Sequence, residues 1–139
     1  MIDSFQGENR WLSNFWPCRV QLDGEWYNSI EAAYVAGKTT DIGARKTIRS
    51  MESPGQIKRF GRTLKLRPDW EQVKVPLMLG LLRQKFAKGS DLGNRLLATG
   101  NQPLVEGNAW GDTFWGVCRG KGLNTLGKLL MQVRDEISR

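Results

Sequence analysis

Glu31 and Lys38 are seven residues apart in a segment, residues 28–38, whose apolar side chains recur at helical spacing. Two turns of an α-helix bring side chains at this spacing to nearly the same direction, so both can line one pocket wall. A lysine among apolar and cationic neighbours loses its proton more readily, and its neutral amine can attack the anomeric carbon of a sugar. A glutamate in the same cleft can move protons. The pair is therefore a candidate for covalent and acid-base chemistry.

The same two residues also have ordinary structural explanations. Glu31 follows Asn28 by three positions and can complete a capping box, while Lys38 can serve as a cation near a helix end. Either Asn28 or Ser29 is able to cap the first turn of this helix. Spacing alone favours these structural explanations, because most such pairs lie on ordinary helix surfaces.

The sequence has no histidine, which removes the usual proton shuttle near neutral pH and the most common metal ligand. Ser-His-Asp and Cys-His sites are thereby excluded, and acid-base chemistry falls to Asp, Glu, Lys, Tyr or water. Cys18 and Cys118 are too few and too far apart for a metal knuckle. We expect two buried thiols, and neither a disulfide nor a metal site.

Positive charge is concentrated in one part of the chain. Residues 38–67 hold nine bases and only two acids, Asp41 and Glu52, which accounts for the whole net charge of +7. Such a density suits the phosphates of a nucleotide or polynucleotide, and the alternative is a solvated helical face. The nine bases are Lys38, Arg45, Lys46, Arg49, Lys58, Arg59, Arg62, Lys65 and Arg67.

Residues 107–116, GNAWGDTFWG, combine glycines and tryptophans in a pattern too irregular for a helix or strand. The segment is typical of a binding loop, in which tryptophan faces stack on planar bases and Asp112 orients a ribose hydroxyl or a water. The alternative is a loop that fills the core and leaves Asp112 as a turn residue. Asn14 and Asn124 each lie among apolar residues, where an amide can read a base edge. For Asn124 the alternative is capping of the last helix.

A chain of 139 residues with 40% hydrophobic and 25% charged residues is typical of one globular domain, here residues 1–139. It has no apolar run long enough to span a membrane and no signal peptide, so we expect a cytosolic protein. Asp23-Gly24 predicts a tight hairpin, Asp69 a helix cap, and Pro76 an interruption of the helix that follows. The remaining expectations are helices over 28–38, 41–51, 54–60, 69–86, 92–98 and 123–137, and a strand over 103–108. Their order indicates an α+β fold, mostly helical with a small hairpin sheet, in a single compact domain.

Together these segments resemble the NADAR family of N-glycosidases over nearly the whole chain. The matching pieces are F-x-G-E at 5–8, WLSNFWP at 11–17, SIEAAYVAGK at 29–38, GR at 61–62, RPDW at 67–70, LLATG at 96–100, LVEGN-x-WGDTFWG at 104–116 and N-x-LG-x-LLM at 124–131. The resemblance implies cleavage of an N-glycosidic bond at a ribose carbon, without a metal or organic cofactor. Some members act on phosphoribosyl-amino intermediates of riboflavin synthesis, and others remove ADP-ribose from guanine in nucleic acid.

The resemblance also implies roles for individual residues. Lys38 attacks the anomeric carbon of the ring-opened ribose to give a Schiff-base-type intermediate, Glu31 protonates the departing nitrogen and then activates water, and Asp112 assists. The family usually has a histidine after the glutamate and a glutamine four residues after it, where this chain has Ala32 and Val35. Substrate contacts are expected from Asn14, Phe15, Arg62, Trp70, Trp115, Gly116 and Asn124.

The basic segment favours a polyanionic substrate, so we expect ADP-ribosylated guanine, as a nucleotide or in nucleic acid, to be both substrate and partner. The alternative enzyme is a riboflavin-pathway glycosidase acting on a small phosphoribosyl metabolite. Two alternatives without catalysis are a reader domain that binds ADP-ribose or NAD and a nucleic-acid-binding module. No membrane partner is expected, and the oligomeric state is left open.

Overall fold

The computed structural model describes residues 1–139, which form two units, Asn14–Lys85 and Met1–Ser13 together with Phe86–Arg139. The secondary structure confirms the α+β class, with six α-helices, one 3-10 helix and two small two-stranded sheets. None of the helices combines the length and hydropathy that crossing a lipid bilayer would require.

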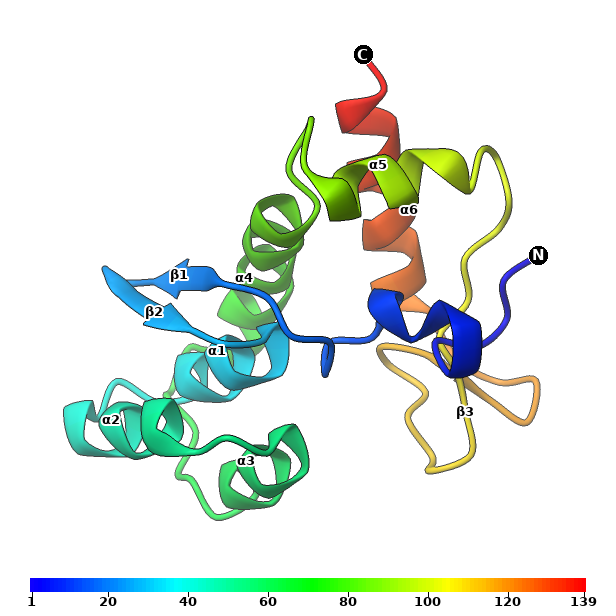
Figure 1. The fold of residues 1–139 in the computed structure, drawn as a ribbon. Coiled ribbons are helices and arrows are strands. Elements are labelled where there is room, and N and C mark those ends of the chain that lie inside the picture. The colour runs from blue at the N-terminus through cyan, green and yellow to red at the C-terminus, as the bar shows by residue number, and fades with distance from the viewer. The chain divides into compact units, whose positions relative to one another are not determined.

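The unit Asn14–Lys85 consists of a hairpin and four helices. Its strands pair antiparallel, and Asp23 and Gly24 at the turn have φ of 49° and 83°, as a type I′ turn requires. Figure 1 shows the first helix between this hairpin and the two helices that follow it. The elements are β1 (Val20–Leu22), β2 (Glu25–Tyr27), α1 (Ile30–Gly37), α2 (Ile42–Ser50), α3 (Pro54–Gly61) and α4 (Trp70–Lys85).

Helix α1 begins with a side-chain cap and is built from small residues. The Ser29 hydroxyl accepts a hydrogen bond from the Ala32 amide at 3.0 Å, which satisfies one of the free donors of the first turn. Because Ser29 and not Asn28 is the cap, Glu31 lies at the second helical position, and the expected capping box with Asn28 is wrong. A β-carbon at Gly37 would meet the terminal methyl group of Leu77, so α4 lies close to α1 at this glycine.

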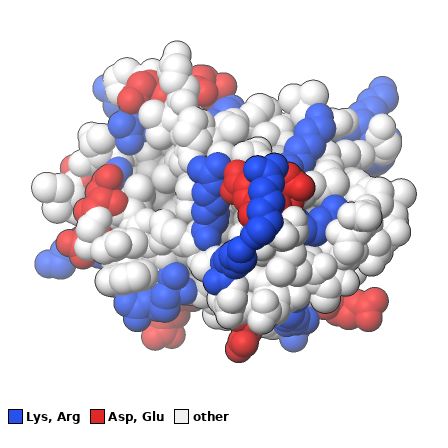
Figure 2. All heavy atoms as spheres, turned by 90° about the horizontal axis from the view of Figure 1, so that it is seen from above, with Lys and Arg blue, Asp and Glu red and all other residues white.

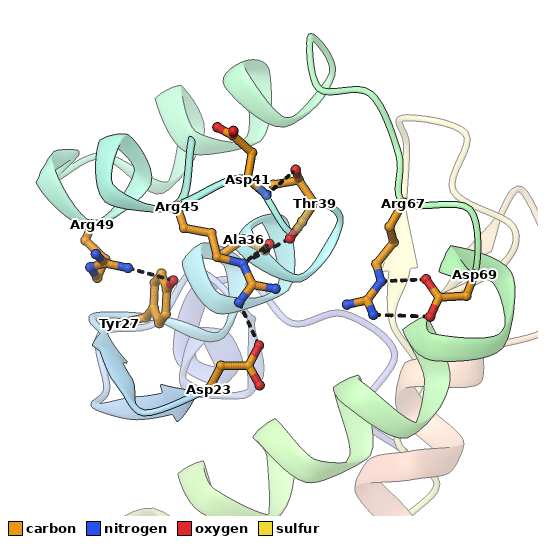
Figure 3. A network of polar contacts seen from close by, with 9 residues as sticks. All are labelled: Asp23, Tyr27, Ala36, Thr39, Asp41, Arg45, Arg49, Arg67 and Asp69. Atoms are coloured by element: carbon orange, nitrogen blue, oxygen red, sulfur yellow. Dashed lines mark hydrogen bonds and ion pairs between the residues drawn. The ribbon is translucent and has the colours of Figure 1, made fainter. Parts of the chain in front are cut away.

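Both ends of α1 are held by other parts of the unit. The Glu31 amide donates to the Asn14 carbonyl at 3.0 Å, and the Lys38 carbonyl accepts from the Arg67 amide at 2.8 Å. Near the second end, the Arg45 Nε is shared between the carbonyls of Ala36 and Thr39, each at 3.0 Å (Figure 3). The backbone of α1 is therefore fixed at the positions of Glu31 and Lys38.

The helices after α1 lie close to the expected ranges, with differences at Asp69 and Pro76. Asp41 caps α2 by accepting from the Ala44 amide at 2.7 Å. The Asp69 carboxylate does not cap α4, because it accepts two hydrogen bonds from the Arg67 guanidinium at 2.6 and 3.1 Å (Figure 3). Pro76 lies inside α4 without ending it, so the helix runs on from Trp70 past the expected interruption.

The other unit contains the remaining elements and forms only part of the strand expected over 103–108. Residues 107–108 form a strand parallel to 117–118, and Leu104 forms an isolated parallel bridge with Ile2. Between them, the Asn124 side chain accepts from the Glu106 amide and donates to the Leu104 carbonyl, both at 2.9 Å. The elements are the 3-10 helix η1 (Gly7–Leu12), α5 (Asp91–Ala98), β3 (Gly107–Asn108), β4 (Val117–Cys118) and α6 (Thr125–Ile137).

Both cysteines are free thiols, as expected from the sequence. Cys118 is buried and Cys18 is half-buried, with a thiol pKa that burial raises above its ordinary value. A raised pKa lowers the thiolate fraction at neutral pH, so Cys18 is a poor nucleophile.

Arg45 should contribute measurably to stability, because its guanidinium joins the end of α1 to the hairpin through Asp23 at 2.6 Å. Replacing Arg45 with lysine keeps the charge but loses the planar fork that reaches two carbonyls and a carboxylate together. We expect Arg45→Lys to lower the free energy of unfolding by about 1.5–3 kcal/mol in urea titration. The exposed neighbour Lys46 is the control, and Lys46→Arg should leave the midpoint unchanged. Equal midpoints for the two variants would contradict this role for Arg45.

Candidate active site

Glu31, Tyr34 and Lys38 form one half-buried stripe along α1, whose other residues are buried. The Lys38 Nζ lies 5.5 Å from the centre of the Tyr34 ring, close enough for a cation–π contact. Behind it, the Tyr34 ring is 5.2 Å from the ring of the buried Trp70. Trp70, expected to contact substrate, therefore supports Tyr34, and its contact with a substrate stays a prediction.

Helix α3 brings two further cations to this stripe. Lys58 on α3 and Arg62 at its C-terminal cap both act electrostatically on Lys38. The close approach depends on Gly61, where a β-carbon would lie 3.0 Å from a Val35 methyl group and 3.7 Å from the Lys38 Nζ. Glu31, Lys38, Lys58 and Arg62 thus form one charged cluster, which we call the α1–α3 cluster.

Burial dominates the ionisation of the two central groups of this cluster. Burial raises the pKa of the Glu31 carboxyl above its ordinary value, and the positive charges of Lys58 and Lys38 oppose that rise in part. Burial also lowers the pKa of the Lys38 amine; the Glu31 carboxylate opposes this fall, while Arg62 and Lys58 add to it. Both pKa shifts are towards the neutral form of the group, which is the form that a nucleophilic amine or a general acid needs.

Asn14 and Phe15 lie beside the α1–α3 cluster. The Asn14 Nδ2 has only a weak acceptor, the Met78 sulfur at 3.7 Å, and its Oδ1 is buried without a hydrogen-bond partner. A buried oxygen left unpaired costs about 1–3 kcal/mol, so it is suited to accept a bond from a ligand. The Phe15 ring, 40% exposed, lies 6.0 Å from the Lys58 Nζ. Substrate contacts from both residues stay predictions.

The other expected site residues lie in the unit that contains α6. Asp112 Oδ1 accepts from the amides of Phe114 and Trp115 at 3.1 and 2.9 Å, so this oxygen stabilises a turn. Gly116 is buried, and a β-carbon there would collide with the Glu106 backbone. The roles proposed for these residues in catalysis or substrate binding stay predictions.

Asn124 occupies the N-terminal cap position of α6 with a left-handed backbone, φ 54° and ψ 40°. Its side chain makes no capping hydrogen bond, because both of its polar atoms hold the backbone at Leu104 and Glu106. Asn124 therefore occupies the cap position, as the capping alternative predicted, but its side chain does not cap the helix. A substrate contact from Asn124 stays a prediction.

Three of the nine bases in residues 38–67 bind partners within the protein itself. Arg45 binds the end of α1 and Asp23, Arg67 binds Asp69, and Arg49 donates to the Tyr27 hydroxyl at 3.1 Å (Figure 3). Their partners include acids outside the basic segment, which the local count of acids missed. The charge available to a ligand is therefore smaller than the sequence suggests.

Tyr34 and Lys58 were not expected beside Glu31 and Lys38. The position of Tyr34 could have been predicted, since it lies three residues after Glu31 and four before Lys38 on the same helix face. Lys58 was visible in the sequence only as one of nine bases suited to phosphate, because the packing of α3 against α1 is what brings it close.

Comparisons with known proteins identify similar sequences and a similar fold. The chain is 40% identical over 132 residues to N-glycosidase YbiA of Escherichia coli, covering 91% of this chain and 81% of that protein. It is 36% identical over 129 residues to a riboflavin biosynthesis protein of Vibrio vulnificus, of which it spans only 35%. The NMR structure of Escherichia coli YbiA matches with a TM-score of 0.85 and 35% identity, covering 99% of this chain and 87% of that one.

The family model described as the NADAR domain matches residues 3–138. The resemblance seen in the motifs is thus confirmed across the fold as well as the sequence, and the chain belongs to the NADAR family.

Proposed function

We propose that this protein is an N-glycosidase that hydrolyses the bond between ribose C1 and a base nitrogen, and that its substrate is ADP-ribosylated guanine in nucleic acid. The observation that carries the proposal is the α1–α3 cluster, where burial lowers the pKa of Lys38, with Arg62 and Lys58 adding to the fall, and raises the pKa of Glu31 against the opposing charges of Lys58 and Lys38. Relatives named N-glycosidases, which this chain matches over most of their length, support the reaction class.

The first half of the reaction uses Lys38 as nucleophile and Glu31 as acid. In the ring-opened sugar, C1 is doubly bonded to the base nitrogen. The lysine Nζ adds to C1, the second bond between C1 and the base nitrogen breaks, and one proton moves from Nζ to the base nitrogen. Glu31 then gives its proton to the base nitrogen as the C1–N bond breaks and the base leaves. C1 remains doubly bonded to the lysine nitrogen, as a Schiff base.

The second half restores the enzyme by hydrolysis. The Glu31 carboxylate takes a proton from water, and the water oxygen adds to C1. The lysine amine leaves as the C1 aldehyde forms, and Glu31 is again protonated. Across both halves one water is consumed, and free ribose product and base are released.

Cationic side chains near the Lys38 amine favour a substrate that carries phosphate groups. Lys58 and Arg62 belong to the α1–α3 cluster, and Lys46, Arg59 and Lys65 are exposed side chains of the same basic segment. On the face drawn in Figure 2, by contrast, blue basic side chains enclose a group of red acidic ones, which weakens the positive potential there. The exposed bases of residues 38–67 are therefore the best candidates for contacts to phosphate.

A riboflavin-pathway substrate is the second candidate. It is favoured by the names of two relatives, the Vibrio vulnificus protein and a chloroplastic riboflavin biosynthesis protein of Zea mays, each matched over 91% of this chain. Such a phosphoribosyl-amino substrate carries one phosphate and needs fewer cations.

Removal of the amine should abolish turnover. We expect Lys38→Ala to lower the release of ribose product by more than about 1,000-fold, as loss of a covalent nucleophile does. Reduction with borohydride during turnover should attach the sugar to Lys38 in the wild type, detected by peptide mass spectrometry. The control is Lys128→Ala, a lysine exposed on α6 that should keep full activity. Near wild-type turnover by Lys38→Ala would exclude the lysine mechanism.

Glu31→Gln should separate stability from activity. Because the pKa of this carboxyl is raised on folding, its contribution to stability is complete at low pH and is lost as pH rises through the folded-state pKa. At neutral pH the glutamine variant should therefore melt a few degrees higher than the wild type, and this gain should vanish in acid. Its turnover should fall at least about 100-fold. A lower melting temperature than wild type at neutral pH would contradict the raised pKa.

Salt dependence should distinguish the two substrates. If three or four side chains contact phosphates of nucleic acid, kcat/KM on ADP-ribosylated DNA should fall roughly 40- to 150-fold between about 50 and 200 mM salt. A phosphoribosylaminouracil substrate should change only a few-fold over the same range. Faster turnover of the aminouracil compound, with equal salt dependence for both, would favour the riboflavin reading.

A further inference from the structure

A cavity lies in the unit Asn14–Lys85, beside the α1–α3 cluster. It has a volume of about 220 Å³, and neither Glu31 nor Lys38 lines it. Its walls come from the start of α1, the end of α2, the segment between α2 and α3, and the loop before β1. The residues that matter for the argument are Phe15, Asn28, Ala32, Arg49, Met51 and Glu52. We call this hollow the α1–α2 cavity.

The α1–α2 cavity lies at the Glu31 end of α1. Ala32, which lines it, directly follows Glu31, whereas Lys38 caps the opposite end of the helix. Phe15 also lines it, and the Lys58 amine over the Phe15 ring is the cation that acts most strongly on the Glu31 carboxyl. The cavity and the carboxyl therefore share Lys58 as a neighbour.

We propose that the α1–α2 cavity is the subsite for the leaving base, and that it selects a planar heteroaromatic ring bearing amino groups. This inference rests on the proposed N-glycosidase reaction, in which C1 lies between Lys38 and Glu31. The base is attached to C1 and receives the proton of Glu31, so it must lie on the Glu31 side, where the cavity is.

The size of the cavity fits one ring system. A cavity of about 150 Å³ holds a benzene molecule, whereas pockets for whole ligands of drug size have roughly 300–1,000 Å³. A volume of 220 Å³ lies between these values. It has room for a purine or pyrimidine base, and the ribose and phosphates must lie outside it.

The residues that line the cavity can contact both the flat faces and the polar edge of such a ring. Ile48, Met51 and Ile57 offer apolar surface, and Phe15 offers an aromatic face for stacking. The Glu52 carboxylate, an exposed acceptor at the rim, can take two hydrogen bonds from ring or exocyclic N–H groups. Arg49 is held by the Tyr27 hydroxyl and adds donors for a ring carbonyl. Guanine and aminouracil both present amino and carbonyl groups along one edge.

Turnover by cavity variants tests the proposal. Met51→Trp fills the cavity, and its control is Met51→Leu, which conserves the side-chain volume. Glu52→Gln removes the charged acceptor, and its control is Glu71→Gln, the same change at an exposed site on α4. We expect Met51→Trp and Glu52→Gln to lower kcat/KM for base release at least tenfold, and both controls to stay within twofold of wild type. Folding is checked by circular dichroism and thermal melting.

A second measurement separates this subsite from the lysine chemistry. Ribose 5-phosphate has no base, so its trapping on Lys38 by borohydride should be the same in Met51→Trp and wild type. Normal trapping together with normal base release by a folded Met51→Trp and by Glu52→Gln would overturn the subsite and leave the lysine mechanism intact. Absence of trapping in the wild type would instead refute the lysine mechanism.

The subsite can also be tested by the binding of free bases, without measuring turnover. With methyl-¹³C methionine, titration with 9-methylguanine or 5-aminouracil should shift the Met51 signal saturably, and the Met131 signal of α6 should not move. The base that shifts Met51 at the lower concentration identifies the preferred ring size. Failure of both bases to shift Met51 at millimolar concentration would refute the subsite even if the lysine mechanism holds.

Discussion

Helix α1 has only eight residues, too short to be stable as an isolated helix in water, so its position depends on contacts with the rest of the unit. The Asn14 carbonyl holds its first turn, and the Arg67 amide and the Arg45 guanidinium hold its last. Small residues on its buried faces let α3 and α4 approach closely. This packing leaves one stripe for reactive side chains, and it places cations from α3 beside that stripe. The ionisation of Glu31 and Lys38 follows from the same packing.

Local signals were sufficient to predict most elements of the fold. Asp23-Gly24 predicted the hairpin, and Ser29, Asp41 and Ser53 each cap a helix close to where the sequence places its start. The failures share a physical cause, which is competition from distant partners. Asp69 had the right position for a cap but a stronger partner in Arg67. Residues 103–108 were expected as one strand, yet their backbone bonds three distant partners in turn, which are Ile2, the Asn124 side chain and Val117.

Only the part of the candidate site that lies on helix α1 could be predicted from the sequence. The spacing of Glu31 and Lys38 is a property of α1, so their common face was visible in the sequence. The identity of the neighbouring cations was not, because three arginines of the basic segment bind internal partners and Lys58 reaches the site through packing of α3. A count of charges along the sequence does not distinguish bases that bind internal partners from bases that are available to a ligand. The amide oxygen of Asn14 illustrates the same limit, since only the fold shows that it is buried and unpaired.

Gly61 has a consequence for the geometry of the amine itself. A lysine nitrogen that forms a double bond to carbon changes from tetrahedral to planar, and the attached carbon can no longer rotate freely about that bond. The chain beside Nζ carries only a hydrogen at this position, whereas a methyl group would lie in van der Waals contact with the nitrogen. In the proposed Schiff-base mechanism, the space that glycine leaves gives the imine plane room to form and turn, and it is created by the backbone of α3.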